Sequence, residues 1–229
     1  MMKMKRYAVY YAPRAGEFAE AAASWLGWDV TKGCDVDQPS FDGLNLPLSE
    51  LTKAPRKYGF HGTIRAPFRV ASNVSETEVR SCVAELARNL APLQMAGLRL
   101  NVLHGFLAFT PKGDLTELMT LGAAVVKGTN ALRAPLTDAE RARRNPETLS
   151  PRQIELLDLY GYPSVMEEFK FHLTLSDHLT DTQIAPLQAV AETYFLHVMP
   201  EPFEIEDLCL FGEDTDGRFH LIHRYVLTG

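Results

Sequence analysis

The sequence predicts an α+β fold with two pseudo-symmetric lobes, each an antiparallel sheet with helices outside it, and a cleft between the lobes. One observation is an internal repeat, because both halves of the 229-residue chain run in the order helix, strand, helix, strand, strand. The other is a pair of similar strands, at 58–64 (YGFHGTI) and 169–175 (FKFHLTL). We therefore expect one bilobal domain over residues 1–229, with repeats at approximately 5–112 and 113–229.

Periodicity and capping signals place the elements of the first half. A strand at 7–11 precedes a helix at 16–26, which ends at Gly27. The stretch 28–57 is rich in Pro, Asp and Gly, and a loop of that length is often a lid or substrate loop. A strand at 58–66 follows, and the capping box Ser75-x-x-Glu78 opens the next helix. The half ends with strands at 98–103 and 106–110.

The second half begins with helices. The expected helix starts are at Asp114, Thr137, Ser150 and Thr180. Gly161 is expected to end the third of these helices, whereas Pro186 is expected to limit or kink the fourth. The expected strands are at 169–176, 204–211 and 219–227.

Composition narrows the class of partner. A net charge of −6 and a pI near 5.7 argue against a protein whose main ligand is long nucleic acid, and favour a small or short substrate. Cys34, Cys82 and Cys209 are far apart, which is typical of reduced thiols in a cytosolic protein. No apolar run approaches the roughly 20 residues of a membrane helix, and the apolar stretch after the basic N-terminus is too short for the apolar core of a signal peptide. We expect a cytoplasmic protein with no membrane partner.

The repeated strands each present a polar face, because side chains alternate along a strand. These faces comprise His61, Thr63 and Arg65 in the first copy, and Lys170, His172, Thr174 and Ser176 in the second. If a pseudo-twofold relates the halves, both faces line one cleft. Two imidazoles can act as acid and base near neutral pH. The expected phosphate ligands are the hydroxyls of Thr63, Thr174 and Ser176 and the guanidinium of Arg65. This kit is suited to a phosphodiester and needs neither metal nor cofactor.

The paired motifs, His61-Gly62-Thr63 and His172-Leu173-Thr174, resemble the two-histidine (2H) phosphoesterase superfamily. That superfamily includes RNA 2′,3′-cyclic phosphodiesterases, RNA ligases of the same fold and plant cyclic nucleotide phosphodiesterases. The strings at 6–13, 57–63 and 161–174 are similar to a poorly characterised branch associated with phosphonate-utilisation operons. The resemblance implies that the two histidines are catalytic and that the two threonines bind phosphate. Position 65 is usually lysine in that branch, and arginine holds oxygen ligands differently.

Other residues have weaker support as ligands of the substrate. Possible substrate-binding residues are Lys57, Tyr11, Tyr58, Lys170 and Tyr162. The arginines at 141, 143 and 144 favour a solvated helix face, with phosphate contact as the alternative. His220 and His223 do not predict a metal pair, because a separation of three puts them on opposite faces of a strand.

Three functions remain open from the sequence. The leading hypothesis is a metal-independent phosphodiesterase acting on a small phosphate ester, such as a cyclic one, in phosphonate metabolism. The second is an RNA 2′,3′-cyclic phosphodiesterase or RNA-end ligase, which the acidic pI disfavours. The third is a non-catalytic protein that binds a nucleotide or a phosphonate metabolite. The sequence does not indicate an oligomeric state.

Overall fold

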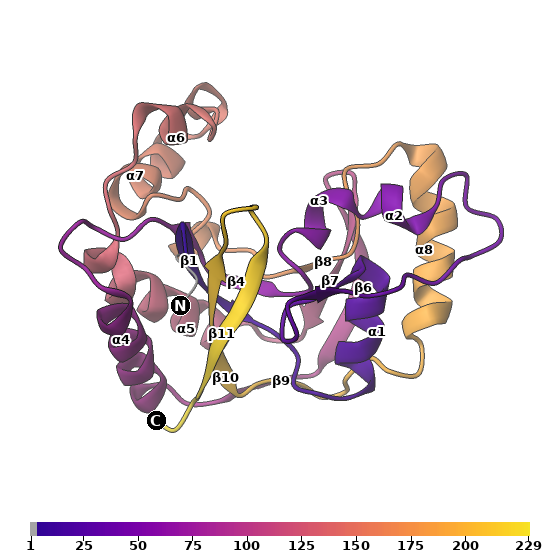
Figure 1. Ribbon diagram of the computed structural model, residues 1–229, viewed down its shortest axis with the longest axis horizontal. Helices are drawn as coiled ribbons and strands as arrows, with labels where there is room; N and C mark the ends of the chain where they lie inside the picture. The colour runs from indigo at the N-terminus through magenta and orange to yellow at the C-terminus, as the bar shows by residue number, and fades with distance from the viewer. Residues whose placement is uncertain (1–3) are drawn as a thin grey trace.

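The computed structural model describes residues 4–229, and a seven-stranded sheet forms its centre (Figure 1). The strands are β1 (Arg6–Tyr11), β4 (Gly62–Phe68), β6 (Gly97–Leu103), β7 (Phe106–Lys112), β8 (Leu173–Thr174), β10 (Asp207–Glu213) and β11 (Phe219–Val226). Their order is β11-β10-β1-β4-β8-β7-β6, and neighbours pair antiparallel. The expected α+β class with antiparallel strands is confirmed.

The two sequence halves interleave in this sheet. β4 and β8, which carry the repeated motifs, are neighbours. The β6–β7 hairpin of the first half lies beyond β8, and the β10–β11 hairpin of the second half lies beyond β1. Pairing β4 with β8 gives their backbone groups partners that two separate sheets would leave at exposed edges. Two lobes, each with its own sheet, are therefore not confirmed.

Eight α-helices surround the sheet in the described chain. They are α1 (Glu17–Leu26), α2 (Leu48–Leu51), α3 (Lys53–Arg56), α4 (Glu76–Asn89), α5 (Thr116–Thr129), α6 (Asp138–Ala142), α7 (Pro151–Tyr160) and α8 (Asp181–Phe195). The capping box expected at Ser75 is present, and the helix starts expected at Thr137, Ser150 and Thr180 each have one as well. The helix expected to start at Asp114 begins at Thr116 instead, with Leu115 at the N-cap. Pro186 lies inside α8 without ending it.

The long helices cover one face of the sheet. The main core joins buried side chains of α1, α4, α5 and α8 to the inward residues of the central strands, among them Val9, Ile64 and Leu173. In Figure 1, α4 and α5 lie at the β10–β11 end of the molecule, and α1 and α8 lie at the β6–β8 end. The opposite face of β4 and β8 is left open to a pocket. None of the helices in residues 4–229 is both long enough and apolar enough to cross a membrane.

Several element boundaries differ from the expected ones. The strand expected at 58–66 begins at Gly62, because Gly59 adopts a left-handed turn with φ 67°. The strand expected at 169–176 shortens to β8, after a 3-10 turn at Met166–Glu168. The strand expected at 204–211 divides into β9 (Phe203–Ile205) and β10, and β9 pairs with an unexpected β5 (Leu93–Met95).

The 28–57 segment is less irregular than expected. It contains a short hairpin of β2 (Trp28–Asp29) and β3 (Cys34–Asp35), followed by α2 and α3.

Two further 3-10 turns, Asn130–Leu132 and Pro146–Thr148, lie before and after α6. The three cysteines are free thiols.

Candidate active site

The pairing of β4 with β8 brings the two motifs together. Gly62 is opposite Leu173 in the antiparallel register. Continuing that register by one residue in each direction sets His61 opposite Thr174, and Thr63 opposite His172. Directly opposite residues of an antiparallel pair point to the same face. The two histidines and two threonines therefore project together from the face that the helices leave uncovered.

Both imidazoles are held in the same way. Nδ1 of His61 lies 2.8 Å from the carbonyl oxygen of Gly59, and Nδ1 of His172 lies 2.8 Å from that of Lys170. A carbonyl oxygen only accepts, so Nδ1 of each ring donates. The Nε2 atom of each ring is then the one available for proton transfer.

The surroundings of His61 make it a neutral imidazole at pH 7. Its ring stacks on Tyr10 with centroids 4.0 Å apart, and Tyr58 lies 5.9 Å away. Burial lowers the pKa of His61 to about 4; the Gly59 carbonyl opposes this shift, and the charge of His172 adds to it. The Nε2 of His61 therefore carries a lone pair and suits a base.

His172 lies in a more open position at the edge of the pocket. Its half-buried ring is 5.6 Å from that of Phe106, which lines the cavity. His172 itself is not among the lining residues. It is nonetheless close enough to lower the pKa of His61. Water at this position can solvate an imidazolium, which suits a proton donor.

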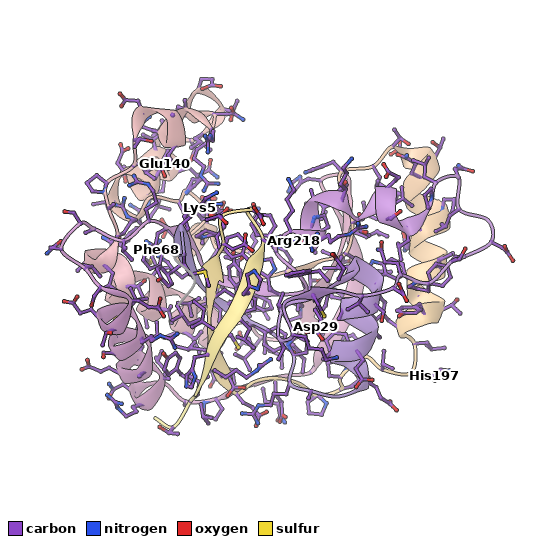
Figure 2. All side chains as sticks on the ribbon, viewed as in Figure 1. Lys5, Asp29, Phe68, Glu140, His197 and Arg218 are labelled. Carbon is purple, nitrogen blue, oxygen red and sulfur yellow. The ribbon has the colours of Figure 1, made fainter. Side chains whose placement is uncertain are left out.

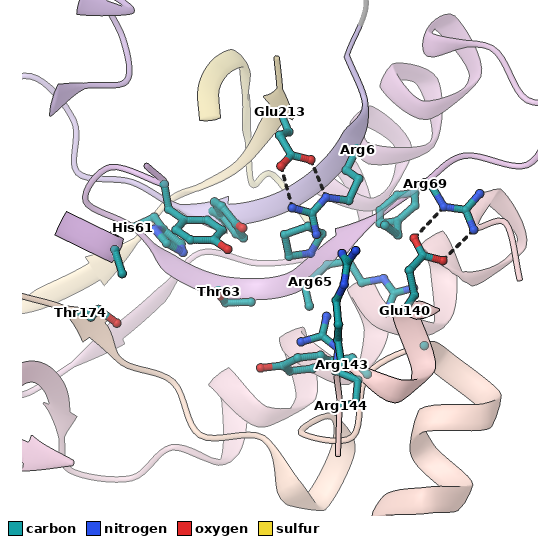
Figure 3. A pocket seen from close by; sticks show the side chains of 18 of the residues that line it. Arg6, His61, Thr63, Arg65, Arg69, Glu140, Arg143, Arg144, Thr174 and Glu213 are labelled. Atoms are coloured by element: carbon teal, nitrogen blue, oxygen red, sulfur yellow. Dashed lines mark hydrogen bonds and ion pairs between the residues drawn. The ribbon is translucent and has the colours of Figure 1, made fainter. Parts of the chain in front are cut away.

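A cavity of about 900 Å³ lies over these residues (Figure 3). Its volume is that of a site for a small organic ligand. His61, Thr63 and Thr174 line it and face its interior. Ser176 also lines it, but its hydroxyl already accepts from the Leu107 amide and donates to the Asp177 carbonyl, each at 2.9 Å. The two threonines are therefore better placed than Ser176 to bind a phosphate.

The cavity wall is basic although the protein is acidic overall. Seven lysines and arginines line it, against three acidic residues. The basic residues are Lys5, Arg6, Arg65, Arg69, Arg133, Arg143 and Arg144. Of the acidic ones, Glu213 pairs with Arg6 and Glu140 with Arg69. For Arg143 and Arg144 the sequence favoured a solvated helix face, with phosphate contact as the alternative. Both residues line the cavity, so a bound substrate can reach them.

The remaining candidates divide between the cavity and other places. Tyr58 and Tyr162 line the cavity. Tyr11 is buried in the main core, packed edge-on against Phe203, on the other face of β1. Lys57 and Lys170 are exposed and do not line the cavity.

Tyr10 is one of several lining residues that sequence reasoning missed. It is adjacent to Tyr11 and stacks on His61. Both faces of β1 are apolar, so alternation alone gives no signal for which tyrosine faces the site. Within residues 4–229, no group of three or more His, Cys, Asp or Glu side chains has the arrangement of a metal site.

Comparison with known proteins identifies the family. A model described as "Protein of unknown function (DUF1045)" matches residues 63–220. The chain belongs to this family. The match begins two residues after His61 and contains the whole second motif.

Two curated relatives are named "Ribose 1,5-bisphosphate phosphokinase PhnN". The one from Janthinobacterium sp. (strain Marseille) is 34% identical over 220 residues, covering 93% of this chain and 49% of the relative. The one from Laribacter hongkongensis (strain HLHK9) is 33% identical over 222 residues, covering 96% and 51%. The chain thus spans about half the length of these two relatives.

Solved structures resemble the chain distantly. A structure titled "Crystal structure of phosphoesterase" matches with a TM-score of 0.47 and 14% identity, over 99% of this chain and 100% of the other. E. coli LigT in its apo form matches with a TM-score of 0.46 and 13% identity, over 99% of each chain. TM-scores below 0.5 are too low to assign an activity.

Proposed function

We propose that this DUF1045 protein is a metal-independent phosphodiesterase of the 2H type that hydrolyses a small phosphodiester. The observation that carries the proposal is the β4–β8 pairing, which sets two imidazoles and two threonine hydroxyls on one face beside a basic cavity. In each imidazole Nδ1 is held by a backbone carbonyl, so both Nε2 atoms remain available. This arrangement supplies an acid, a base and phosphate ligands without further groups.

The difference between the histidines assigns their roles. Nε2 of neutral His61 removes a proton from water as the water oxygen attacks phosphorus. The bond between phosphorus and the leaving oxygen breaks, and that oxygen takes a proton from Nε2 of His172. Thr63 and Thr174 donate hydrogen bonds to the non-bridging oxygens, where negative charge accumulates. A cyclic diester opens to a monoester with a free hydroxyl, and solvent returns the proton from His61 to His172.

The cavity and the relatives support a phosphorylated sugar as the substrate. The relatives' name refers to a pentose with two phosphates, and a cyclic phosphate ester of a pentose is small enough for a cavity of about 900 Å³. A place in phosphonate metabolism remains part of this proposal. Kinase activity is not part of it, because the chain contains no Gly-Lys dipeptide and hence no P-loop of the G-x-x-x-x-G-K-[ST] type.

RNA ends are the second candidate substrate. Tyr58 and Tyr162 lie in the cavity wall, where an aromatic ring can stack on a base. The guanidinium of Arg144 already lies 4.8 Å from the ring centre of Tyr162, which occupies one of these faces. A single terminal nucleotide is therefore a better fit than a long strand.

The test is phosphodiester turnover in the presence of EDTA. The panel contains ribose cyclic phosphates, nucleoside 2′,3′-cyclic phosphates and short RNA ends, assayed with the wild type and the double variant His61→Ala/His172→Ala. We expect turnover that survives EDTA and is lost in the double variant, while the exposed His197→Ala leaves it unchanged. Full activity in the double variant would refute the mechanism. Binding without turnover across the panel would favour a binding protein.

A further inference from the structure

Arg65 is a buried guanidinium that the protein leaves largely unpaired. The residue is only 1% exposed. Its Nη1 donates to the Tyr160 carbonyl at 2.8 Å, while Nε and Nη2 have no hydrogen-bond partner among the described residues. The guanidinium also lies 5.2 Å from the centre of the Phe68 ring, but two buried donors without acceptors still destabilise the fold. A ligand that pairs with Nε and Nη2 would remove that destabilisation.

The position of Arg65 separates it from the paired motifs. It lies two residues beyond Thr63 on β4, and two residues span about 7 Å along a strand. The Tyr160 carbonyl, at the end of α7, holds the guanidinium toward α7 and away from β8. Figure 3 shows Arg65, Arg143 and Arg144 gathered on the side of the pocket away from His61 and Thr174.

The surroundings of Arg65 favour an anion. Arg133 also lines this part of the cavity, and burial together with the charge of Arg133 lowers the pKa of Arg65 to about 10. Both groups remain cationic at pH 7, so they repel each other until an anion separates them. Figure 2 shows Lys5, Phe68 and Glu140, further residues of this wall, on the same side of the molecule as α6 and α7.

The protein's own carboxylates do not neutralise Arg65. Glu213 is bound by Arg6 and Glu140 by Arg69. Asp177, the third acidic residue of the wall, accepts from the Ala54 amide at 2.7 Å. The anion must therefore come with the ligand, and the planar fork of a guanidinium suits a phosphate.

We propose that Arg65, with Arg133, Arg143 and Arg144, forms a second anion subsite that binds a phosphate monoester. The substrate class that follows is a phosphodiester carrying a second phosphate across a sugar-sized spacer. The diester lies between His61, Thr63 and Thr174, and the monoester lies at Arg65. The placement of the diester rests on the proposed function, whereas anion binding at Arg65 does not.

The binding test uses ribose 5-phosphate, measured by calorimetry. We expect Arg65→Met to weaken its binding by about 10- to 100-fold, as for loss of a charge-assisted hydrogen bond. Arg65→Lys should recover part of the affinity, and His61→Ala/His172→Ala should bind as the wild type does. Unchanged binding in Arg65→Met would overturn the subsite. Equal loss in Arg65→Met and in the histidine double variant would indicate one shared phosphate site and would also overturn it.

The kinetic test compares nucleoside 2′,3′-cyclic phosphates, and ribose cyclic phosphates, with and without a 5-phosphate group. We expect the wild type to prefer the 5-phosphorylated compounds by at least tenfold in kcat/KM, and Arg65→Met to lose that preference. Turnover without such a preference would leave the phosphodiesterase standing and refute the subsite. If ribose 5-phosphate binding depends on Arg65 but no diester is turned over, the subsite stands and the phosphodiesterase is refuted.

A structural role for Arg65 is tested with Arg56 as the matched control. Arg56 donates to the carbonyls of Leu26 and Ser49 and to the side chain of Gln38, away from the cavity lining. Arg56→Met should therefore lower Tm, whereas Arg65→Met should lower it less or raise it, because it removes a buried charge with one hydrogen bond and one ring contact. A loss of Tm in Arg65→Met as large as that in Arg56→Met would assign Arg65 to the fold and refute the subsite.

Discussion

The two His-x-Thr motifs share their hydrogen bonds and differ in their surroundings. Each imidazole is held through Nδ1 by the carbonyl of the residue two positions earlier. The half-buried His61 lies against Tyr10 and near Tyr58, whereas the half-buried His172 lies beside Phe106 and makes its hydrogen bond in a more exposed position. Equal hydrogen bonds fix equal tautomers, whereas burial of the His61 ring lowers the pKa of that imidazole. In the proposed mechanism a duplicated motif therefore supplies both an acid and a base, because its neighbours differ.

The same asymmetry extends to the core side of the two strands. The residue between His and Thr is Gly62 in one copy and Leu173 in the other. The ring of Phe171 lies over Gly62, so closely that a Cβ there would be 2.2 Å from it. Because position 62 is a glycine, the Phe171 ring of the second copy can pack directly against the backbone of the first copy. This contact packs the two motifs against each other and holds their polar sides in register.

The largest expected difference between the two histidines depends on the leaving group of the substrate. His172→Ala should lose about 10²- to 10⁴-fold in kcat on a diester with an alkoxide leaving group, since that oxygen needs a proton. With 4-nitrophenolate, which leaves without one, the loss should nearly vanish. His61→Ala should lose activity on both substrates, because activation of water is needed in each case.

Steady-state kinetics on both substrates check this assignment, with His197→Ala as a control for the loss of an exposed imidazole. If 4-nitrophenolate rescues His61→Ala instead, the roles of the two histidines are reversed. If it rescues neither variant, general acid catalysis by either histidine is refuted.

The threonines should behave more alike than the histidines. Thr63 and Thr174 both line the cavity and are diagonal neighbours across the β4–β8 pair. Thr63→Val and Thr174→Val should each lower kcat/KM by about 10- to 100-fold, as for a hydrogen bond to a charged oxygen, and serine at either position should restore most of it. Thr120→Val, on the exposed side of α5, is the control. A large loss at one position alone would show that the phosphate lies nearer one motif.

The sequence patterns predicted which side chains share a face of a strand better than they predicted which strands pair in the sheet. Alternation along each strand put His61 with Thr63 and His172 with Thr174, and both pairs do face the same side. The capping box at Ser75 and the proline after Ser150 located helix starts correctly, because both signals act within four residues.

Strand pairing depends on contacts between distant segments of the chain. Hydrophobic periodicity carries no information about such contacts. Pairing of β4 with β8 joins residues 111 positions apart, and it turns two expected sheets into one. The basic wall is similarly non-local: Arg65 comes from β4, whereas Arg133, Arg143 and Arg144 come from the segment around α6. The sequence favoured a solvated helix face for Arg143 and Arg144, because it does not show that their segment lies over the cavity.

The pH dependence of activity should report the burial of His61. Because the pKa of His61 is lowered to about 4, kcat/KM should rise with pH through about 4 as the base loses its proton. Tyr58→Ala should admit water to the ring and move this limb upward, toward the ordinary value of 6.5 for imidazole, with a several-fold loss at pH 5. Phe106→Ala, on the His172 side, should leave this limb in place. A limb near 6.5 in the wild type would contradict the neutral, buried base.

The smallest expected effect is on stability, and it has the same physical origin. The pKa of His61 is about 4 in the folded state and near 6.5 when unfolded. Between these values the unfolded chain binds the additional proton, so the free energy of unfolding falls as the pH falls from about 6.5 to about 4. His61→Asn removes that proton site and should therefore lose less Tm than the wild type between pH 7 and pH 5, by about 2–4 °C per kcal/mol removed. His197→Asn is the matched control, and thermal unfolding at both pH values is the measurement. Identical losses in the wild type and His61→Asn would mean that folding leaves the protonation of His61 unchanged, and the difference between the two motifs would then lie in geometry alone.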